Sequence, residues 1–357
     1  MSIKYNGGYI PAVGADGTTL VANSSASTGV SWAGPTFTAG KNAIINGDFG
    51  VWQRGTSFAS PAAGAYNTDR FYYNYGGSGA TRTISQQTFT PGTAPVTGYE
   101  GTYFWRLAQT VAGTSSTYDV LVQPIEDVRK FAAQTLTVSF YAKSDATRAI
   151  TPTFVQNFGS GGSGSVTTSG TSITTTTSWV RYTQTFAIPS ISGKTIGTSS
   201  HLDLQMYFPN NTVQTIDIWG VQVEAGSVAT PFTTATGTLS GELAACQRYY
   251  FRTTLSAAGA AIIGFGTAQS TTVAMIGVKL PVTMRTIPSS TVESSGLWIC
   301  DGASTINTSA SITSGGGQAP DPNVMNIVAT GTGLVQYRPY YLFAATTSAY
   351  LGITAEL

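Results

Sequence analysis

The sequence predicts an all-β protein with an N-terminal extended arm, a jelly-roll β-sandwich and a smaller C-terminal β-sandwich. Three observations predict this fold. The chain has 357 residues, and at about 150 residues per domain this length allows two to three domains. Apolar and polar residues alternate over short stretches that end in Gly, Ser or Thr turns, which is the period of β-strands. Helical spacing is nearly absent, since only residues 125–133 carry apolar side chains at i, i+3 and i+6.

Residues 1–40 are predicted to form an anchoring arm. They are rich in Gly, Ser, Thr and Ala and carry isolated large side chains, of which Tyr5, Tyr9, Ile10 and Trp32 are the candidate contact residues. So few apolar groups cannot form a core of their own. We therefore expect the arm to become ordered only against a partner surface or neighbouring subunits.

Residues 41–236 are predicted to form the jelly-roll sandwich, because short strands follow one another at a spacing of roughly 8–12 residues. Three strands have clear inward faces, which are Leu136, Val138, Phe140 and Ala142; Val180, Tyr182 and Phe186; and Leu202, Leu204, Met206 and Phe208. Thr215–Glu224 is apolar on both faces and changes sides at Gly220, which predicts a central strand with a bulge. The segment Gly159–Thr177 is expected to be a mobile hairpin or a wide loop.

Residues 237–357 are predicted to form the second, distal sandwich. One or two helical turns are expected at Leu239–Cys246, directly after a turn-rich boundary. Strands are expected at Gln247–Thr254, Thr272–Val282, Gly296–Asp301, Val324–Ala329 and Tyr340–Leu357. A segment of about 120 residues with these strands is long enough for a small sandwich.

The charge composition excludes some partners. Seventeen Lys and Arg face sixteen Asp and Glu, and charged residues make up 9% of the chain, against a usual share of about 25%. Nucleic acid binding needs clustered cations, so we expect no nucleic acid partner. There is no apolar run of about 18 residues and no signal-like start, so neither membrane insertion nor classical export is expected. The two cysteines, Cys246 and Cys300, leave their disulfide state open.

The residues that carry catalysis in other proteins are scarce. His201 is the single histidine, and alternation places it opposite the core face, as a solvent-facing or interface residue, with no nucleophile elbow in the chain. Two cysteines and one histidine do not make a closed zinc site. Asp203 and Asp217 lie on neighbouring predicted strands and are either a pair of facing carboxylates or separate partners of turns and arginines. We predict no catalytic residue, no metal and no cofactor, and therefore no enzyme.

Two further sets of charged residues have a structural interpretation. Asn46, Asp48 and Glu224 lie at the first and last strands of the jelly roll, where calcium is one interpretation. The alternative, which we prefer, is that Asp48 caps its own turn and Glu224 accepts backbone N–H groups. Asp69 and Arg70 are expected to form a structural pair.

Aromatic side chains are the remaining candidates for ligand binding, because sugar rings pack on aromatic faces without needing charge. In Phe71–Tyr75, inward Phe71 and Tyr73 place Tyr72 and Asn74 outward, as a stacking ring beside an amide. Tyr340 and Tyr341 are the candidates in the distal sandwich. The alternative is that these rings belong to the core or to subunit interfaces, with alternation burying one of Tyr340 and Tyr341.

Three parts of the chain resemble bacteriophage virion proteins. They are NAIINGDFGVWQRGTSF (Asn42–Phe58) with NTDRFYY (Asn67–Tyr73); IWGVQVEAGSVATPF (Ile218–Phe232); and CQRYY (Cys246–Tyr250) with MRTIP (Met284–Pro288) and the final AEL. They are similar to tail or head fibre and capsid decoration proteins with a jelly-roll domain like that of carbohydrate-binding modules.

The resemblance implies a structural fibre or decoration protein. It implies assembly in the host cytoplasm, a place on the virion surface, a homotrimer, and a capsid or tail partner bound through residues 1–40. A host-surface glycan is a possible further partner, with residues 237–357 as the host-facing tip. The alternatives are a polysaccharide depolymerase and a purely carbohydrate-binding adhesin. The head or tail location and the receptor are left open.

Overall fold

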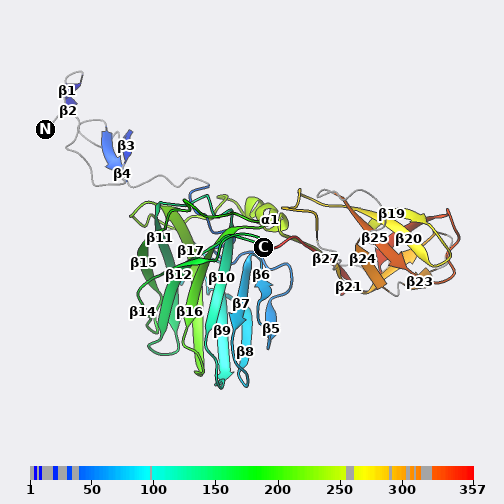
Figure 1. The fold of residues 1–357 in the computed structure, drawn as a ribbon, viewed down its shortest axis with the longest axis horizontal. Coiled ribbons are helices and arrows are strands. Elements are labelled where there is room, and N and C mark those ends of the chain that lie inside the picture. Colours follow the sequence, from blue (N-terminus) through cyan, green and yellow to red (C-terminus); the bar gives the residue numbers. More distant parts are fainter. Residues whose placement is uncertain are drawn as a thin grey trace. The chain divides into compact units, whose positions relative to one another are not determined.

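The computed structural model describes residues 4–5, 8–9, 19–22, 30–33, 40–96, 99–254, 261–288, 292–302, 306–308, 311–314 and 324–357. Within these ranges the regular structure is antiparallel β-sheet together with one helix, α1 (Leu239–Gln247) (Figure 1). The all-β prediction is confirmed. The chain forms two compact units, Met1–Gly50 with Asn74–Thr238, and Val51–Tyr73 with Leu239–Leu357.

The described part of the N-terminal segment contains two short β-ladders. β1 (Lys4–Tyr5) pairs with β2 (Gly8–Tyr9), and β3 (Thr19–Ala22) pairs with β4 (Val30–Ala33). The backbones of Tyr5 and Tyr9 lie in the first ladder and that of Trp32 in the second, opposite Leu20. Ile10 lies outside the described residues. The anchoring role of this segment stays a prediction.

The first unit contains two sheets. One has the order β13 (Val166–Ser169), β12 (Ala149–Asn157), β16 (His201–Phe208) and β10 (Asp119–Glu126), with β14 (Ile173–Thr174) also paired to β12. The other has the order β15 (Val180–Ala187), β11 (Thr135–Ser144), β17 (Gln214–Ala225), β9 (Tyr103–Val111) and β8 (Thr81–Thr88). Their inner faces meet where Trp105 of β9 stacks on Phe208 of β16 at 5.8 Å between ring centroids, and Phe154 of β12 meets Phe186 of β15 at 4.9 Å. This unit is therefore a β-sandwich.

Alternation predicted most of the inward faces correctly. The predicted sets on β11 and β16 are all buried, and β17 is a central strand between β11 and β9. Gly220 has φ +64, and the β11–β17 register shifts between Ser139 and Tyr141, which confirms the bulge. Val180 was wrongly placed inward. It is 38% exposed because it begins the edge strand β15.

Two local predictions are corrected by the backbone. Residues 125–133 contain no helix, because Ile125 and Glu126 end β10 and the remainder forms i to i+3 turns between Asp127 (φ 67) and Ala133 (φ 58). Positive φ at both ends is incompatible with a continuous right-handed helix. Gly159–Thr177 is partly sheet, since β13 and β14 both pair with β12.

The second unit contains two antiparallel sheets. A three-stranded sheet has the order β18 (Tyr250–Thr254), β27 (Tyr350–Thr354) and β21 (Val292–Ser295). A seven-stranded sheet has the order β23 (Ile306–Thr308), β22 (Leu297–Cys300), β26 (Pro339–Ala344), β19 (Ile262–Ala268), β20 (Val273–Lys279), β25 (Val324–Thr330) and β24 (Ser311–Ser314). One apolar core joins residues of both sheets, among them Ile276, Leu342, Leu351 and Ile353. The predicted helix at Leu239–Cys246 is confirmed as α1.

Residues 51–73 lie with the C-terminal part of the chain, an arrangement that the boundaries drawn from the sequence, 41–236 and 237–357, did not include. This segment contains β5 (Ser57–Ala59), β6 (Ala65–Thr68) and the start of β7 (Phe71–Tyr75), and β6 and β7 form a hairpin. The Gln53 amide donates to Tyr250 O at 2.7 Å, and Arg70 forms an ion pair with Glu356. The segment NTDRFYY, which contains Arg70, and the final AEL, which contains Glu356, thus contact each other, although 286 residues separate Arg70 from Glu356 in the sequence.

Buried polar groups hold this junction together. The Arg70 guanidinium lies 3.4 Å from the centre of the Tyr249 ring, and Arg285 donates to the carbonyl groups of Ala355 and Glu356, each at 2.9 Å. Asp69 accepts from the backbone N and the side-chain amide of Gln53, both at 2.6 Å. In these contacts Asp69 bonds Gln53 and Arg70 bonds Glu356, and the expected pairing of Asp69 with Arg70 stays a prediction.

The cysteines and the helix settle two smaller points. Cys246 in α1 and Cys300 in β22 are both buried and free, so they do not form the disulfide that the sequence left open. Burial raises the pKa of the Cys246 thiol well above its usual value. No helix in the described residues has the length and apolar character needed to cross a membrane.

Candidate functional site

Four polar side chains form a row along the outer face of β16 in the first unit. Tyr207 Oη donates to Gln205 Oε1 at 2.7 Å, and Gln205 Nε2 donates to Asp203 Oδ2 at 3.3 Å. His201 Nε2 lies 3.4 Å from Asp203 Oδ1. The four share one face because side chains two residues apart on a strand point the same way. We call His201, Asp203, Gln205 and Tyr207 the β16 polar row.

His201 and Asp203 are ionisable residues of this row. His201 Nδ1 lies 2.8 Å from Ser199 O, and because a carbonyl oxygen only accepts, Nδ1 carries a hydrogen. Asp203 Oδ1 makes no hydrogen bond within the described residues. Asp203 is 4% exposed, and burial raises the pKa of its carboxyl, with the charge of His201 and the Gln205 hydrogen bond acting in the opposite direction.

The surroundings of the β16 polar row are apolar on one side and hydroxyl-bearing on the other. Gln205 lies opposite Val122 of β10 and Thr153 of β12, and Tyr207 lies opposite Val120 and Thr151. Val120 and Val122 are buried although they lie on the outer face of the sheet. Gln205 and Tyr207 remain partly exposed. A face that combines aligned donors and acceptors with a partly exposed aromatic ring suits a neutral ligand with many hydroxyl groups.

Sequence reasoning identified half of this row. It placed His201 outside the core, which the structure confirms, and it considered Asp203. It missed Gln205 and Tyr207, even though the alternation in His201–Phe208 that directs Leu202, Leu204, Met206 and Phe208 inward also places 201, 203, 205 and 207 on the other face. What the sequence pattern does not show is that Asp203, Gln205 and Tyr207 are hydrogen-bonded to one another.

Asp203 and Asp217 do not form a pair of facing carboxylates. Asp203 is on β16 in one sheet, and Asp217 is on β17 in the other. Arg106 donates to both oxygens of Asp217, at 2.6 and 2.8 Å, and Lys143 lies 3.6 Å away. The alternative that assigns Asp217 to an arginine is therefore confirmed, because the two strands alternate between sheets rather than lying side by side.

Glu224 and Asp48, two of the three residues considered for calcium, have protein hydrogen-bond partners. Glu224 accepts from Thr230 N at 2.7 Å and pairs with Lys41 at 3.2 Å, and Asp48 Oδ1 accepts from Gly50 N at 3.3 Å, as the alternative predicted. Asn42 joins the start and end of the sandwich directly, because its amide donates to Val221 O and Thr233 O, both at 3.0 Å. Within the described ranges no group of three or more His, Cys, Asp or Glu gathers as a metal site would require.

Two of the predicted glycan-binding residues, Tyr72 and Asn74, lie on β7. Phe71 and Tyr73 are 1% exposed while Tyr72 and Asn74 are partly exposed, so the alternation in β7 is as predicted. The Tyr72 ring meets the edge of Tyr66 at 5.2 Å, and Asn74 Oδ1 accepts from Tyr75 N at 3.0 Å. A binding role for these two stays a prediction.

Tyr340 must be removed from the predicted glycan-binding residues. It is 2% exposed, and its hydroxyl accepts from Val335 N at 3.1 Å, so its ring belongs to the core. Tyr341, the next residue on β26, points to the other face, is partly exposed and packs against Phe343 at 5.7 Å between ring centroids. Alternation along β26 therefore leaves one ring of the pair available, as the alternative interpretation stated.

Comparison with known proteins gives distant structural similarity. No family model matches the chain, and no curated protein matches its sequence. Among solved structures, the enzymatically active domain of bacteriophage CBA120 tailspike protein 4 is 14% identical over 52% of this chain and 22% of that chain, with a TM-score of 0.33. A CBM4 structure is 22% identical over 51% of this chain and 100% of that chain, with a TM-score of 0.32. The family 11 carbohydrate-binding module from Clostridium thermocellum, in complex with a β-1,3-1,4-mixed-linked tetrasaccharide, is 15% identical over 48% of this chain and 97% of that chain, with a TM-score of 0.31. Similarities of this size do not establish a shared function.

Proposed function

We propose that this protein is a structural, non-enzymatic component of a bacteriophage virion, a fibre or decoration protein on the virion surface. Residues 1–40 anchor it to the capsid or tail, and it assembles as a homotrimer in the host cytoplasm. The first unit binds neutral glycan of the host surface. The virion role is supported by the sequence resemblance, and the glycan role by the β16 polar row.

The observation that carries the glycan role is the alignment of donors and acceptors along β16. A sugar hydroxyl both donates and accepts, so it can bond the lone pairs of Tyr207 Oη and the partly exposed amide of Gln205 at the same time. The sugar C–H groups can pack along the Tyr207 ring. Asp203 accepts from the side-chain amide of Gln205 at 3.3 Å and so fixes the position of that amide. This arrangement favours an uncharged polysaccharide over an ionic one.

The test is retention of labelled full-length protein on purified host capsule or lipopolysaccharide. We expect retention without shortening of the polysaccharide chains. Gln205→Ala and Tyr207→Phe should each weaken retention by about threefold to tenfold, because a net hydrogen bond contributes about 0.5–1.5 kcal/mol. Gln86→Ala is the matched control, since Gln86 is a partly exposed residue of β8 in the other sheet.

Three results would change the assignment. Shortened polysaccharide would indicate a depolymerase. If Gln205→Ala and Tyr207→Phe both leave retention unchanged, the binding site does not lie on this face. No retention on any host glycan would leave a purely structural role.

A further inference from the structure

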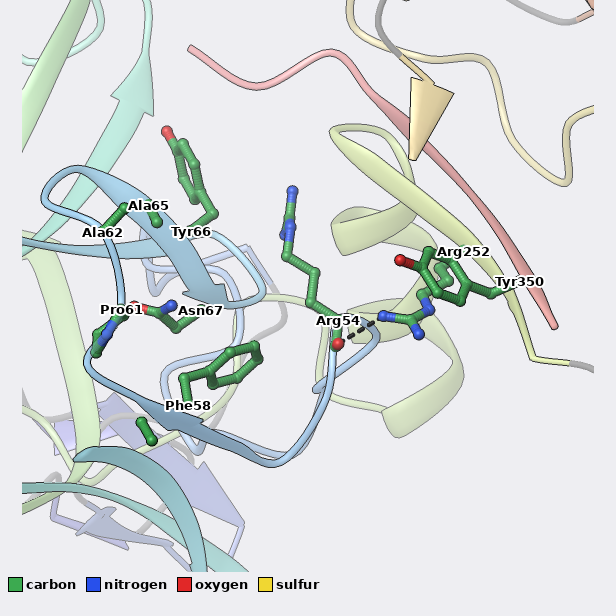
Figure 2. A pocket seen from close by; sticks show the side chains of 10 residues that line it. Arg54, Phe58, Pro61, Ala62, Ala65, Tyr66, Asn67, Arg252 and Tyr350 are labelled. Carbon is green, nitrogen blue, oxygen red and sulfur yellow. Dashed lines mark hydrogen bonds between the residues drawn. The ribbon is translucent and has the colours of Figure 1, made fainter. Parts of the chain in front are cut away.

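The second unit contains a pocket that the β16 polar row does not involve. Its volume is about 350 Å³, and it lies between the segment 54–67 and the strands β18 and β27 (Figure 2). The side chains that define it are Arg54, Phe58, Tyr66, Asn67, Arg252 and Tyr350, with small apolar residues between them. This volume is near the lower end of the range of small-molecule sites, about 300–1,000 Å³.

Two arginines in this pocket are held in place by aromatic rings. The Arg252 guanidinium lies 3.7 Å from the centre of the Tyr350 ring, and its Nη1 donates to Arg54 O at 2.5 Å, as the dashed line in Figure 2 shows. The Arg54 guanidinium lies 3.4 Å from the centre of the Tyr250 ring. Stacking fixes the plane of each guanidinium and leaves N–H groups at its edge for an acceptor.

Protein carboxylates balance these charges only in part. The buried carboxylate of Asp69 interacts electrostatically with Arg54. Arg54 lies 3.4 Å from Glu356, but Glu356 also pairs with the buried Arg70. In the part of the chain that the structure describes, Arg252 forms no ion pair with a carboxylate. The pocket therefore has excess positive charge in a protein whose net charge is only +1. Such a site favours a ligand that carries an anionic group.

Two buried polar atoms in the pocket lack partners within the described residues. Arg54 Nη1 is a donor and Asn67 Oδ1 is an acceptor, and neither makes a hydrogen bond. The Arg54 side chain is 9% exposed and Asn67 is 4% exposed. Buried groups of this kind are uncommon in folded proteins, because each forfeits the hydrogen bonds it had in water. Both residues line the pocket, so a ligand that brings one acceptor and one donor would satisfy both atoms after a small rotation of the two side chains.

We propose that this pocket binds a sugar residue that carries a carboxylate. The carboxylate bonds Arg252 and Arg54 Nη1, a ring hydroxyl donates to Asn67 Oδ1, and the sugar ring packs among Phe58, Tyr66 and Tyr350. Tyr66 is positioned for this role because its hydroxyl donates to Leu357 O at 3.2 Å, which fixes the ring. This site is separate from the neutral glycan face of the first unit and does not depend on it.

The test is calorimetric titration of the full-length protein with glucuronic acid, glucose and sodium sulfate. We expect glucuronic acid to bind at least tenfold more tightly than glucose, because only the former bonds the arginines. We also expect it to bind more tightly than sulfate, which offers neither a ring nor a hydroxyl donor. The affinity for glucuronic acid should fall as salt rises. Sulfate binding as tight as glucuronic acid would mean a general anion site and would overturn the sugar assignment.

Variants separate this pocket from general effects on folding. Arg252→Gln should reduce glucuronic acid affinity at least tenfold, and Asn67→Leu should do the same while leaving the melting temperature unchanged or higher, since it removes an unpartnered buried acceptor. Arg338→Gln is the matched control, because Arg338 is an exposed arginine of the same unit that pairs with Asp301. Equal affinity for glucuronic acid and glucose, no binding of glucuronic acid, or full affinity in Arg252→Gln would each overturn the proposal. Retention on neutral polysaccharide should be the same in all three variants.

Discussion

Replacing Glu356 by Gln should strongly destabilise the second unit. The Glu356 carboxylate is the ion-pair partner of Arg70, whose side chain is 1% exposed, and it also lies 3.4 Å from Arg54. Gln keeps the size of the side chain and one acceptor oxygen but removes the negative charge. Two guanidiniums, one of them fully buried, then remain without the charge that offsets the cost of their burial.

The size of the effect follows from the burial of Arg70. Removing one partner of a buried ion pair costs about 3–5 kcal/mol, because the remaining charge stays in a poorly solvating environment. The Tyr249 ring, 3.4 Å from the Arg70 guanidinium, offers only partial compensation. The amide oxygen that the substitution introduces recovers a further part as an acceptor. We therefore expect the unfolding free energy to fall by about 3 kcal/mol, at the lower end of that range.

The measurement must report on the second unit alone, since the chain has two compact units. Hydrogen exchange at the amides of β18 and β27, followed as a function of urea, gives the local unfolding free energy. Lys279→Gln is the control, because Lys279 is an exposed charged residue of β20 in the same unit and its charge should contribute less than about 1 kcal/mol. A loss below about 1 kcal/mol in Glu356→Gln, equal to the control, would show that the Arg70–Glu356 pair does not stabilise this unit.

Three other predictions concern pH dependence, anchoring and oligomeric state. Burial raises the pKa of Asp69 to about 6 from the ordinary 3.8, so the protonated carboxyl stabilises the fold below about pH 4, and this stabilisation, roughly 3 kcal/mol, is lost as the pH rises through about 6. Thermal unfolding of the wild type should show this decline in stability. An equal decline in the variant Asp69→Asn would assign the effect to another group. Deleting residues 1–40 should leave the cores of both units folded by circular dichroism but abolish incorporation into particles, and full occupancy of the truncated protein on particles would contradict the anchoring role. Light scattering of the full chain should give a homotrimer, and a stable monomer at micromolar concentration would contradict it.

The all-β class and most of the strand faces could be predicted from the sequence alone. Alternation is a local property, because side chains two residues apart on a strand share a face whatever packs against it. This is why Leu202, Leu204, Met206 and Phe208 were assigned correctly to the core, and why the outer position of His201 followed from them. Glycine at a bulge is equally local, since the φ of +64 at Gly220 is a conformation that other residues rarely adopt. The inward face was predicted wrongly at Val180, which is the first residue of the edge strand β15.

The tertiary structure alone decided which distant residues meet. Period-two alternation does not say which strands are neighbours, so it left open whether Asp203 and Asp217 face each other, and only the topology shows that their strands belong to different sheets. The same limit applies to residues 51–73, which lie with the C-terminal unit and bring Arg70 to Glu356, 286 residues away in sequence. The β16 polar row depends on side-chain hydrogen bonds, and the pocket at Arg54 and Arg252 on two segments joined by the fold. Contacts of this kind are set by long-range packing, which leaves no period in the sequence to read.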